Sequence, residues 1–216
     1  MYIIVEWRLL LSYIVRSLSV DGRKHNKIVV LTGVSGSGKD FLSTRLEKRF
    51  HNSSITFAEF GELLYESLAN RFGISSRDDI GKKLSTSDIA FGTQEVITRL
   101  MISQPMVLTG HVFRRQQADY VYAPSLERNI NGICYVFVWA NPEQILEWRN
   151  KDHSRERTIE SVGDIALHQD LSLEVVTTTA KHLGSALHTI WNRTDNFQTN
   201  LDELEYVLVN LLGSLD

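Results

Sequence analysis

One glycine-rich stretch, Lys27–Asp40 (KIVVLTGVSGSGKD), constrains the fold of this chain more than any other. Its first part, Ile28–Thr32, is a β-branched apolar run, which predicts a short strand buried on both faces. Gly33, Gly38 and Lys39 follow at the spacing G-x-x-x-x-G-K. A strand, a glycine-rich turn, a lysine and a helix in this order predict a phosphate-binding loop. The apolar side of the predicted helix carries Phe41, Leu42, Leu46 and Phe50.

Glycine and lysine at these positions suit the binding of nucleotide phosphates. Backbone N–H groups converge on phosphate oxygens only where no side chain blocks their approach, which favours glycine. The first turn of the following helix adds unpaired N–H groups, and the Lys39 ammonium adds positive charge beside the β- and γ-phosphates. An ordinary glycine-rich turn is the alternative, and the glycine order is not the G-x-G-x-x-G of dinucleotide sites. The residues predicted to contact the nucleotide are Gly33, Ser35, Gly36, Ser37, Gly38, Lys39, Asp40 and Phe41.

The composition argues against several other classes of protein. With 216 residues, 43% hydrophobic and 23% charged, the chain suits a single soluble domain. A net charge of −3 gives no sign of a nucleic-acid or membrane-surface partner. The single cysteine, Cys134, lies in an apolar run and is expected to be a reduced core residue, which fits a cytoplasmic protein. Residues 1–26 contain short apolar clusters broken by charges, and are interpreted as a packed amphipathic extension or as a partner or membrane contact.

Predicted strands and helices alternate through the rest of the chain. This alternation implies an α/β fold, in which a five-stranded parallel sheet is covered by helices on both faces. Ligands bind at the carboxyl edge of such a sheet, so the residues that follow each strand are candidates for the site. Residues 75–88 are expected to be a polar stretch, and 116–132 to be irregular. Strands are predicted at 28–32, 54–58, 105–110, 133–140 and 186–191, and helices at 60–72, 88–102, 164–184 and 200–212, with a further helix starting at Asn141.

From about Lys27 to its end the chain resembles the P-loop nucleoside monophosphate kinases. It looks most like the archaeal-type adenylate kinases and their relatives. The loop is the most specific part of this resemblance, and the other stretches gain weight only together. The matching stretches are VVLTGVSGSGK, FGELLYES, SSRDDIGKKL, the histidine after the third strand and NPEQILEWRNKDHSRER.

The resemblance implies a P-loop NTPase three-layer sandwich, with a monophosphate-binding helical region near 58–103 and a short lid near 149–160, within a kinase domain at 27–216. It implies that ATP with Mg²⁺ phosphorylates a nucleoside monophosphate, AMP or dAMP being the first to try. The residues it assigns to catalysis are Lys39, Arg149, Arg155 and Arg157, and those it assigns to the monophosphate are Phe60, Gly61, Arg77 and His111. Simpler interpretations stay open. Arg155 and Arg157 fit a solvated charge run, Arg77 an ion pair with Asp78 or Asp79, and His111 a hydrogen-bonded structural histidine.

Two positions depart from the family's pattern. The family usually has Ser or Thr after the loop lysine, where this chain has Asp40. The archaeal-type relatives have an aspartate two residues before the histidine, where this chain has Thr109. Both departures concern the same Mg²⁺. We therefore interpret them as compensating changes, in which Asp40 and Thr109 exchange the carboxylate and hydroxyl ligands of that ion.

Two other functions remain open from the sequence. The same scaffold could phosphorylate a different small molecule. It could also serve as a nucleotide-dependent switch or slow ATPase that binds a protein partner, a reading that the altered metal site and the N-terminal extension favour. The lid arginines discriminate between these functions, because a switch has little need of Arg155 and Arg157.

Overall fold

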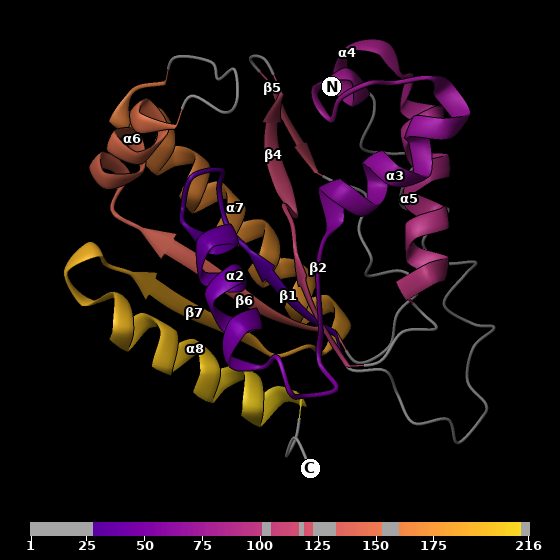
Figure 1. The fold of residues 1–216 in the computed structure, drawn as a ribbon. Helices are drawn as coiled ribbons and strands as arrows, with labels where there is room; N and C mark the ends of the chain where they lie inside the picture. Colours follow the sequence, from indigo (N-terminus) through magenta and orange to yellow (C-terminus); the bar gives the residue numbers. More distant parts are fainter. Residues whose placement is uncertain (1–27, 101–104, 117–118, 123–132, 153–159, 213–216) are drawn as a thin grey trace.

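The computed structural model describes residues 28–100, 105–116, 119–122, 133–152 and 160–212, and these form an α/β sandwich (Figure 1). Five parallel strands make the central sheet, in the order β2-β3-β1-β6-β7. This confirms the five-stranded parallel sheet expected from the sequence. The strands are β1 (Ile28–Thr32), β2 (Thr56–Glu59), β3 (Met106–Thr109), β6 (Ile133–Ala140) and β7 (Leu187–Asn192).

Helices cover both faces of this sheet. They are α2 (Lys39–Arg49), α3 (Phe60–Phe72), α4 (Asp78–Lys83), α5 (Thr86–Leu100), α6 (Pro142–Lys151), α7 (Val162–Leu183) and α8 (Phe197–Leu212). Because side chains alternate along a strand, β1 feeds two cores. Val29 and Leu31 pack with apolar residues of α2 and α8, whereas Ile28 and Val30 pack with those of α3, α5 and α7. The three-layer arrangement follows from this alternation.

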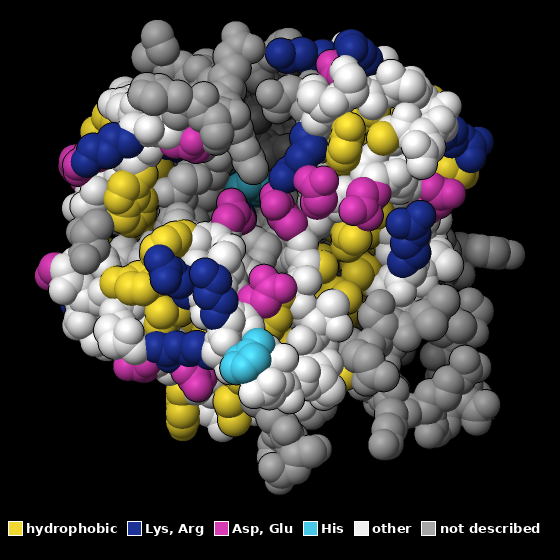
Figure 2. All heavy atoms as spheres, in the orientation of Figure 1, with side chains coloured by type: hydrophobic (Ala, Val, Ile, Leu, Met, Phe, Trp, Pro, Cys, Tyr) yellow, Lys and Arg dark blue, Asp and Glu magenta, His cyan; other side chains and the backbone are white. Residues whose placement is uncertain are grey.

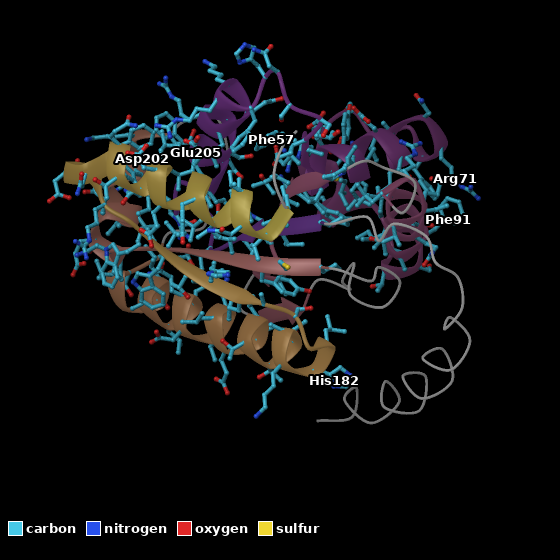
Figure 3. The ribbon with its side chains drawn as sticks, turned by 90° about the horizontal axis from the view of Figure 1, so that it is seen from below. Phe57, Arg71, Phe91, His182, Asp202 and Glu205 are labelled. Carbon is cyan, nitrogen blue, oxygen red and sulfur yellow. The ribbon has the colours of Figure 1, made fainter. Side chains whose placement is uncertain are left out.

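Ion pairs and a cation–π contact tie the helices together at their surfaces (Figure 3). On α2, the Arg49 guanidinium pairs with Asp202 at 2.9 Å and with Glu205, both on α8, and these contacts raise the pKa of Arg49. Where α3 and α5 run side by side, the Arg71 guanidinium lies 3.9 Å from the centre of the Phe91 ring.

Two parts of the chain are more regular than the sequence predicted. In the polar stretch 75–88, the Asp79 carboxylate accepts hydrogen bonds from the backbone N–H groups of Ser75 and Ser76, and this forms the start of α4. Lys83, 3.0 Å away, and the Ser75 N–H hold the pKa of Asp79 well below its usual range. Such a capping carboxylate cannot be told from a solvated charge by periodicity alone.

The second difference lies beyond β3. Strand β4 (Phe113–Gln116) pairs antiparallel with β5 (Asp119–Tyr122), whereas we expected an irregular segment from 116. Four-residue runs are too short for a reliable two-residue period, and pairing with each other supplies the order.

Several predicted segments lie outside the described residues. These include the extension 1–26, residues 101 and 102 of the predicted helix at 88–102, and lid residues 153–159 with Arg155 and Arg157. Within the described ranges, no helix is long and apolar enough to cross a membrane.

Candidate active site

The glycine-rich loop joins β1 to α2 at the carboxyl edge of the sheet. Gly36 and Gly38 have φ angles of +80° and +85°, in the left-handed region that glycine adopts most easily. A Cβ on Gly33 would lie 2.6 Å from the Val138 carbonyl oxygen, so β6 leaves no room for a side chain there. The glycines of the predicted phosphate-binding loop are thus required by backbone conformation and by close packing.

Lys39 begins α2 beneath this loop. Its side chain is 2% exposed, and its Nζ lies 3.4 Å from the Asp40 carboxylate, which is about half exposed. A buried ammonium at the first turn of a helix adds its charge to that of the unpaired N–H groups. The arrangement suits an anion at this end of α2. Beyond Asp40, the half-exposed Phe41 packs its ring 5.0 Å from that of Phe197, at the start of α8.

An open pocket lies next to the loop, and it brings together residues that the sequence keeps far apart. Figure 2 shows a hollow on this face, with acidic and basic side chains at its rim. The pocket is lined by all four residues predicted to bind the monophosphate, and by two from the loop. These six residues are Phe60, Gly61, Arg77, His111, Lys39 and Asp40.

Arg77 reaches this pocket from the residue before α4. Its guanidinium pairs with Glu59 at 2.7 Å and Glu62 at 3.7 Å, at the start of α3. The alternative pairing with Asp79 is wrong, because that carboxylate pairs with Lys83. Gly61 fits between these groups only because it lacks a side chain, since a Cβ there would overlap Nη2 of Arg77.

His111 and Arg149 both contact the backbone of the loop. The Nδ1 of His111 donates to the Gly33 carbonyl at 2.8 Å, so the structural interpretation of this histidine holds even though it also lines the pocket. The Arg149 guanidinium is 7% exposed; it donates to the Ser35 carbonyl from Nε and Nη2, at 2.9 and 2.6 Å, and pairs with Glu160 through Nη1. In this structure Arg149 therefore binds the outside of the loop.

The two predicted metal ligands, Asp40 and Thr109, line a second groove beside the pocket. The buried Thr109 hydroxyl donates to Ser43 Oγ at 2.9 Å, and its lone pairs stay available to a cation or a water. Glu59 lines the same groove. Oxygen donors of this kind fit Mg²⁺, which takes most of its ligands from water and phosphate. Among the described residues, no group of three or more His, Cys, Asp or Glu is placed to hold a metal by itself.

Sequence reasoning assigned no role to three residues of this site, although it placed Asn192 and the segment that begins with Glu59 at the ligand-binding edge of the sheet. Glu59 binds Arg77 and borders both cavities. In the sequence it could have been found as a carboxylate at the end of a strand, directly before Phe60. Glu160 holds Arg149 and had no distinguishing signal in a charged segment. Asn192, at the end of β7, donates from Nδ2 to the Ser37 carbonyl at 2.9 Å, and only its place at the strand's end marked it.

A parallel α/β sheet with a glycine-rich loop after its first strand, a buried lysine and a second pocket beside it defines a P-loop nucleotide-binding protein. The sequence model of a family described as an AAA domain matches residues 32–166, more than half of the chain. An adenylate kinase from Thermococcus kodakarensis is 28% identical over 189 residues, which are 86% of this chain and 94% of the relative. One from Thermoplasma acidophilum is 30% identical over 148 residues, which are 66% of this chain and 77% of the relative.

The chain belongs to the AAA-domain family by this match and to the P-loop nucleoside monophosphate kinases by its relatives, and it is a P-loop kinase. Among solved structures, a shikimate kinase from Bacteroides thetaiotaomicron covers 84% of this chain and 98% of its own length, with 12% identity and a TM-score of 0.48. A similarity at this level does not bear on the substrate.

Proposed function

We propose that the protein transfers the γ-phosphoryl group of ATP to a nucleoside monophosphate, giving ADP and a nucleoside diphosphate. The observation that carries this proposal is one continuous pocket. Its lining joins Lys39 and Asp40, at the start of α2, to Phe60 and Arg77, at the start of α3 and just before α4. A γ-phosphate held at Lys39 would thus face an acceptor held at Arg77. The relatives named adenylate kinases support the same reaction, with AMP or dAMP as the first acceptors to test.

The charges in the pocket fit each half of this reaction. Phosphoryl transfer gains most from positive charge over the oxygens in flight and from fixed positions of donor and acceptor. Lys39 supplies charge at the loop. Arg77 carries a planar set of N–H donors that suits a phosphate dianion. Its pairs with Glu59 and Glu62 are partly exposed, so an acceptor phosphate competes with those carboxylates for the same donors.

Further positive charge over the transferring group is proposed for the lid arginines Arg155 and Arg157. Arg149 would join them once it leaves the Ser35 carbonyl. Asp40 and Thr109 would hold Mg²⁺, which supplies charge neutralisation at the phosphates. The single cysteine supports a cytoplasmic location.

A coupled assay of ADP formation tests the proposal. ATP and magnesium are supplied with a panel of ribo- and deoxynucleoside monophosphates in turn, and with Lys39→Met as the inactive control. Strict dependence of ADP formation on one or two monophosphates is the expected result. Equal ADP formation without any acceptor would instead identify a slow ATPase or switch. Dependence on another small molecule alone would identify a different kinase on this scaffold.

A further inference from the structure

Side chains from outside the loop hold three of its carbonyl groups, at alternate residues. Each donor comes from a different part of the fold: the segment after β3, helix α6 and the end of β7. The carbonyl groups of these alternate residues thus face the surrounding protein. The three pairs are His111 Nδ1 with Gly33 O at 2.8 Å, Arg149 Nε and Nη2 with Ser35 O at 2.9 and 2.6 Å, and Asn192 Nδ2 with Ser37 O at 2.9 Å.

Two further carbonyl groups of the loop accept hydrogen bonds from backbone N–H groups. The Val34 carbonyl accepts from the Ser37 N–H at 3.2 Å, and the Gly38 carbonyl from the Leu42 N–H at 3.0 Å. Gly36 and Gly38, with their positive φ angles, donate no backbone hydrogen bond to any described residue. Left-handed residues within such a loop turn successive N–H groups toward one concave side, where they bind anions. Among the described residues, the protein thus binds these carbonyl groups and leaves the N–H groups of Gly36 and Gly38 to a ligand.

Asn192 is itself held in place by a second buried amide, that of Asn200. It is 7% exposed, and its Oδ1 accepts from Nδ2 of Asn200, which is 3% exposed on α8, at 3.0 Å. Nδ2 of Asn200 also donates to the Arg193 carbonyl at 2.8 Å, which fixes that amide in turn. Because Asn200 donates to the oxygen of Asn192, the amino group of Asn192 must face Ser37 O. Gly38 also packs against this amide, since a Cβ there would overlap Nδ2.

We infer that Asn192, oriented by Asn200, is a positioning residue for phosphate binding, and that with His111 and Arg149 it holds the loop's amides in their binding arrangement before ATP arrives. The inference rests on the proposed function, since it assumes that the loop receives ATP. A loop without these contacts would lose conformational entropy when ATP binds, and this loss would weaken the affinity for ATP. Asn192 never needs to touch the nucleotide to change its affinity.

The test compares Asn192→Ala with Asn210→Ala. Asn210 lies on the exposed side of α8 and donates to the Tyr206 carbonyl of its own helix, so it is the matched control. The first measurement is amide hydrogen exchange in nucleotide-free protein, at the loop's Ser37 N–H, which the Val34 carbonyl protects, and over the buried strand 133–140. Loop exchange about tenfold faster in Asn192→Ala, with the strand and the control variant unchanged, is expected.

The second measurement separates the two substrates. Asn192→Ala should raise KM for ATP about tenfold and leave KM for the monophosphate within twofold. Asn192→Ser, whose side chain keeps a polar group but is too short to reach Ser37 O, should shift both readouts the same way, and it decides the matter if the alanine variant does not fold.

Unchanged loop exchange, or acceleration that is equal in the loop and the strand, would overturn the inference. A wild-type protein that transfers phosphate to no monophosphate would overturn the proposed function instead. The exchange experiment needs no nucleotide, so it would still decide the role of Asn192.

Discussion

Replacing Gly61 with alanine should separate acceptor binding from stability. Gly61 lies in α3, where alanine stabilises a helix by up to about 1 kcal/mol relative to glycine. The added Cβ would overlap Nη2 of Arg77 and lie 2.8 Å from its Cζ, so the guanidinium must leave its pair with Glu59. A partly exposed ion pair of this kind contributes about 0.2–1 kcal/mol. The two effects have opposite signs and similar sizes, so the free energy of unfolding should change little.

Acceptor binding should change much more. If Arg77 holds the monophosphate from its position beside Gly61, the new Cβ moves the guanidinium out of that position and removes charge-assisted hydrogen bonds that contribute about 1.5–3 kcal/mol. Since about 1.4 kcal/mol is a factor of ten, KM for the monophosphate should rise on the order of ten- to a hundredfold. KM for ATP should stay the same, because the loop and Lys39 are untouched.

Steady-state kinetics with each substrate varied in turn, together with thermal unfolding, measure these quantities. Gly163→Ala is the control: it is also a helical glycine, and its new Cβ would meet only Ser161 Oγ at an ordinary 3.7 Å. An acceptor KM that does not move in Gly61→Ala would refute the role given to Arg77. So would a fall in Tm that accounts for the whole loss of activity.

Three further predictions follow from the loop, the metal ligands and α4. Asp40→Ala should raise the magnesium concentration needed for half-maximal ATP binding about tenfold and Asp40→Ser less; an unchanged titration contradicts the exchange of ligands with Thr109. Gly38→Ala should lower Tm and weaken ATP binding more than tenfold, because alanine at a φ of +85° costs about 1–2 kcal/mol and meets the Asn192 amide; wild-type affinity in a titration refutes this. Lys83 and the Ser75 N–H lower the pKa of Asp79 in the folded protein. The ionised Asp79 therefore stabilises the protein at pH values above its unfolded pKa of about 3.9, and this stabilisation is lost as the pH falls toward the lower folded pKa. Asp79→Asn should therefore flatten the dependence of Tm on pH below about pH 4. A Tm that falls with pH as steeply in this variant as in the wild type contradicts the prediction.

Much of the fold could be predicted from the sequence because its causes are local. The run Ile28–Thr32 alternates between two cores, and the positive φ angles at Gly36 and Gly38 demand residues without a Cβ. The order of strands and helices then restricts the sheet to a few topologies. The same order predicted that Lys39, Phe60 and His111 would meet at one edge, and the pocket brings them together.

Tertiary structure alone decided which partner each polar side chain takes. Arg77 bypasses the neighbouring Asp79 for Glu59, because Asp79 is engaged with the backbone that starts α4 and with Lys83. Asn192 reaches the Ser37 carbonyl across 155 positions of sequence, a contact set by the parallel order of β1, β6 and β7. Periodicity and spacing report on backbone conformation and on burial. The choice among donors and acceptors depends on angles and distances that exist only once distant strands lie side by side.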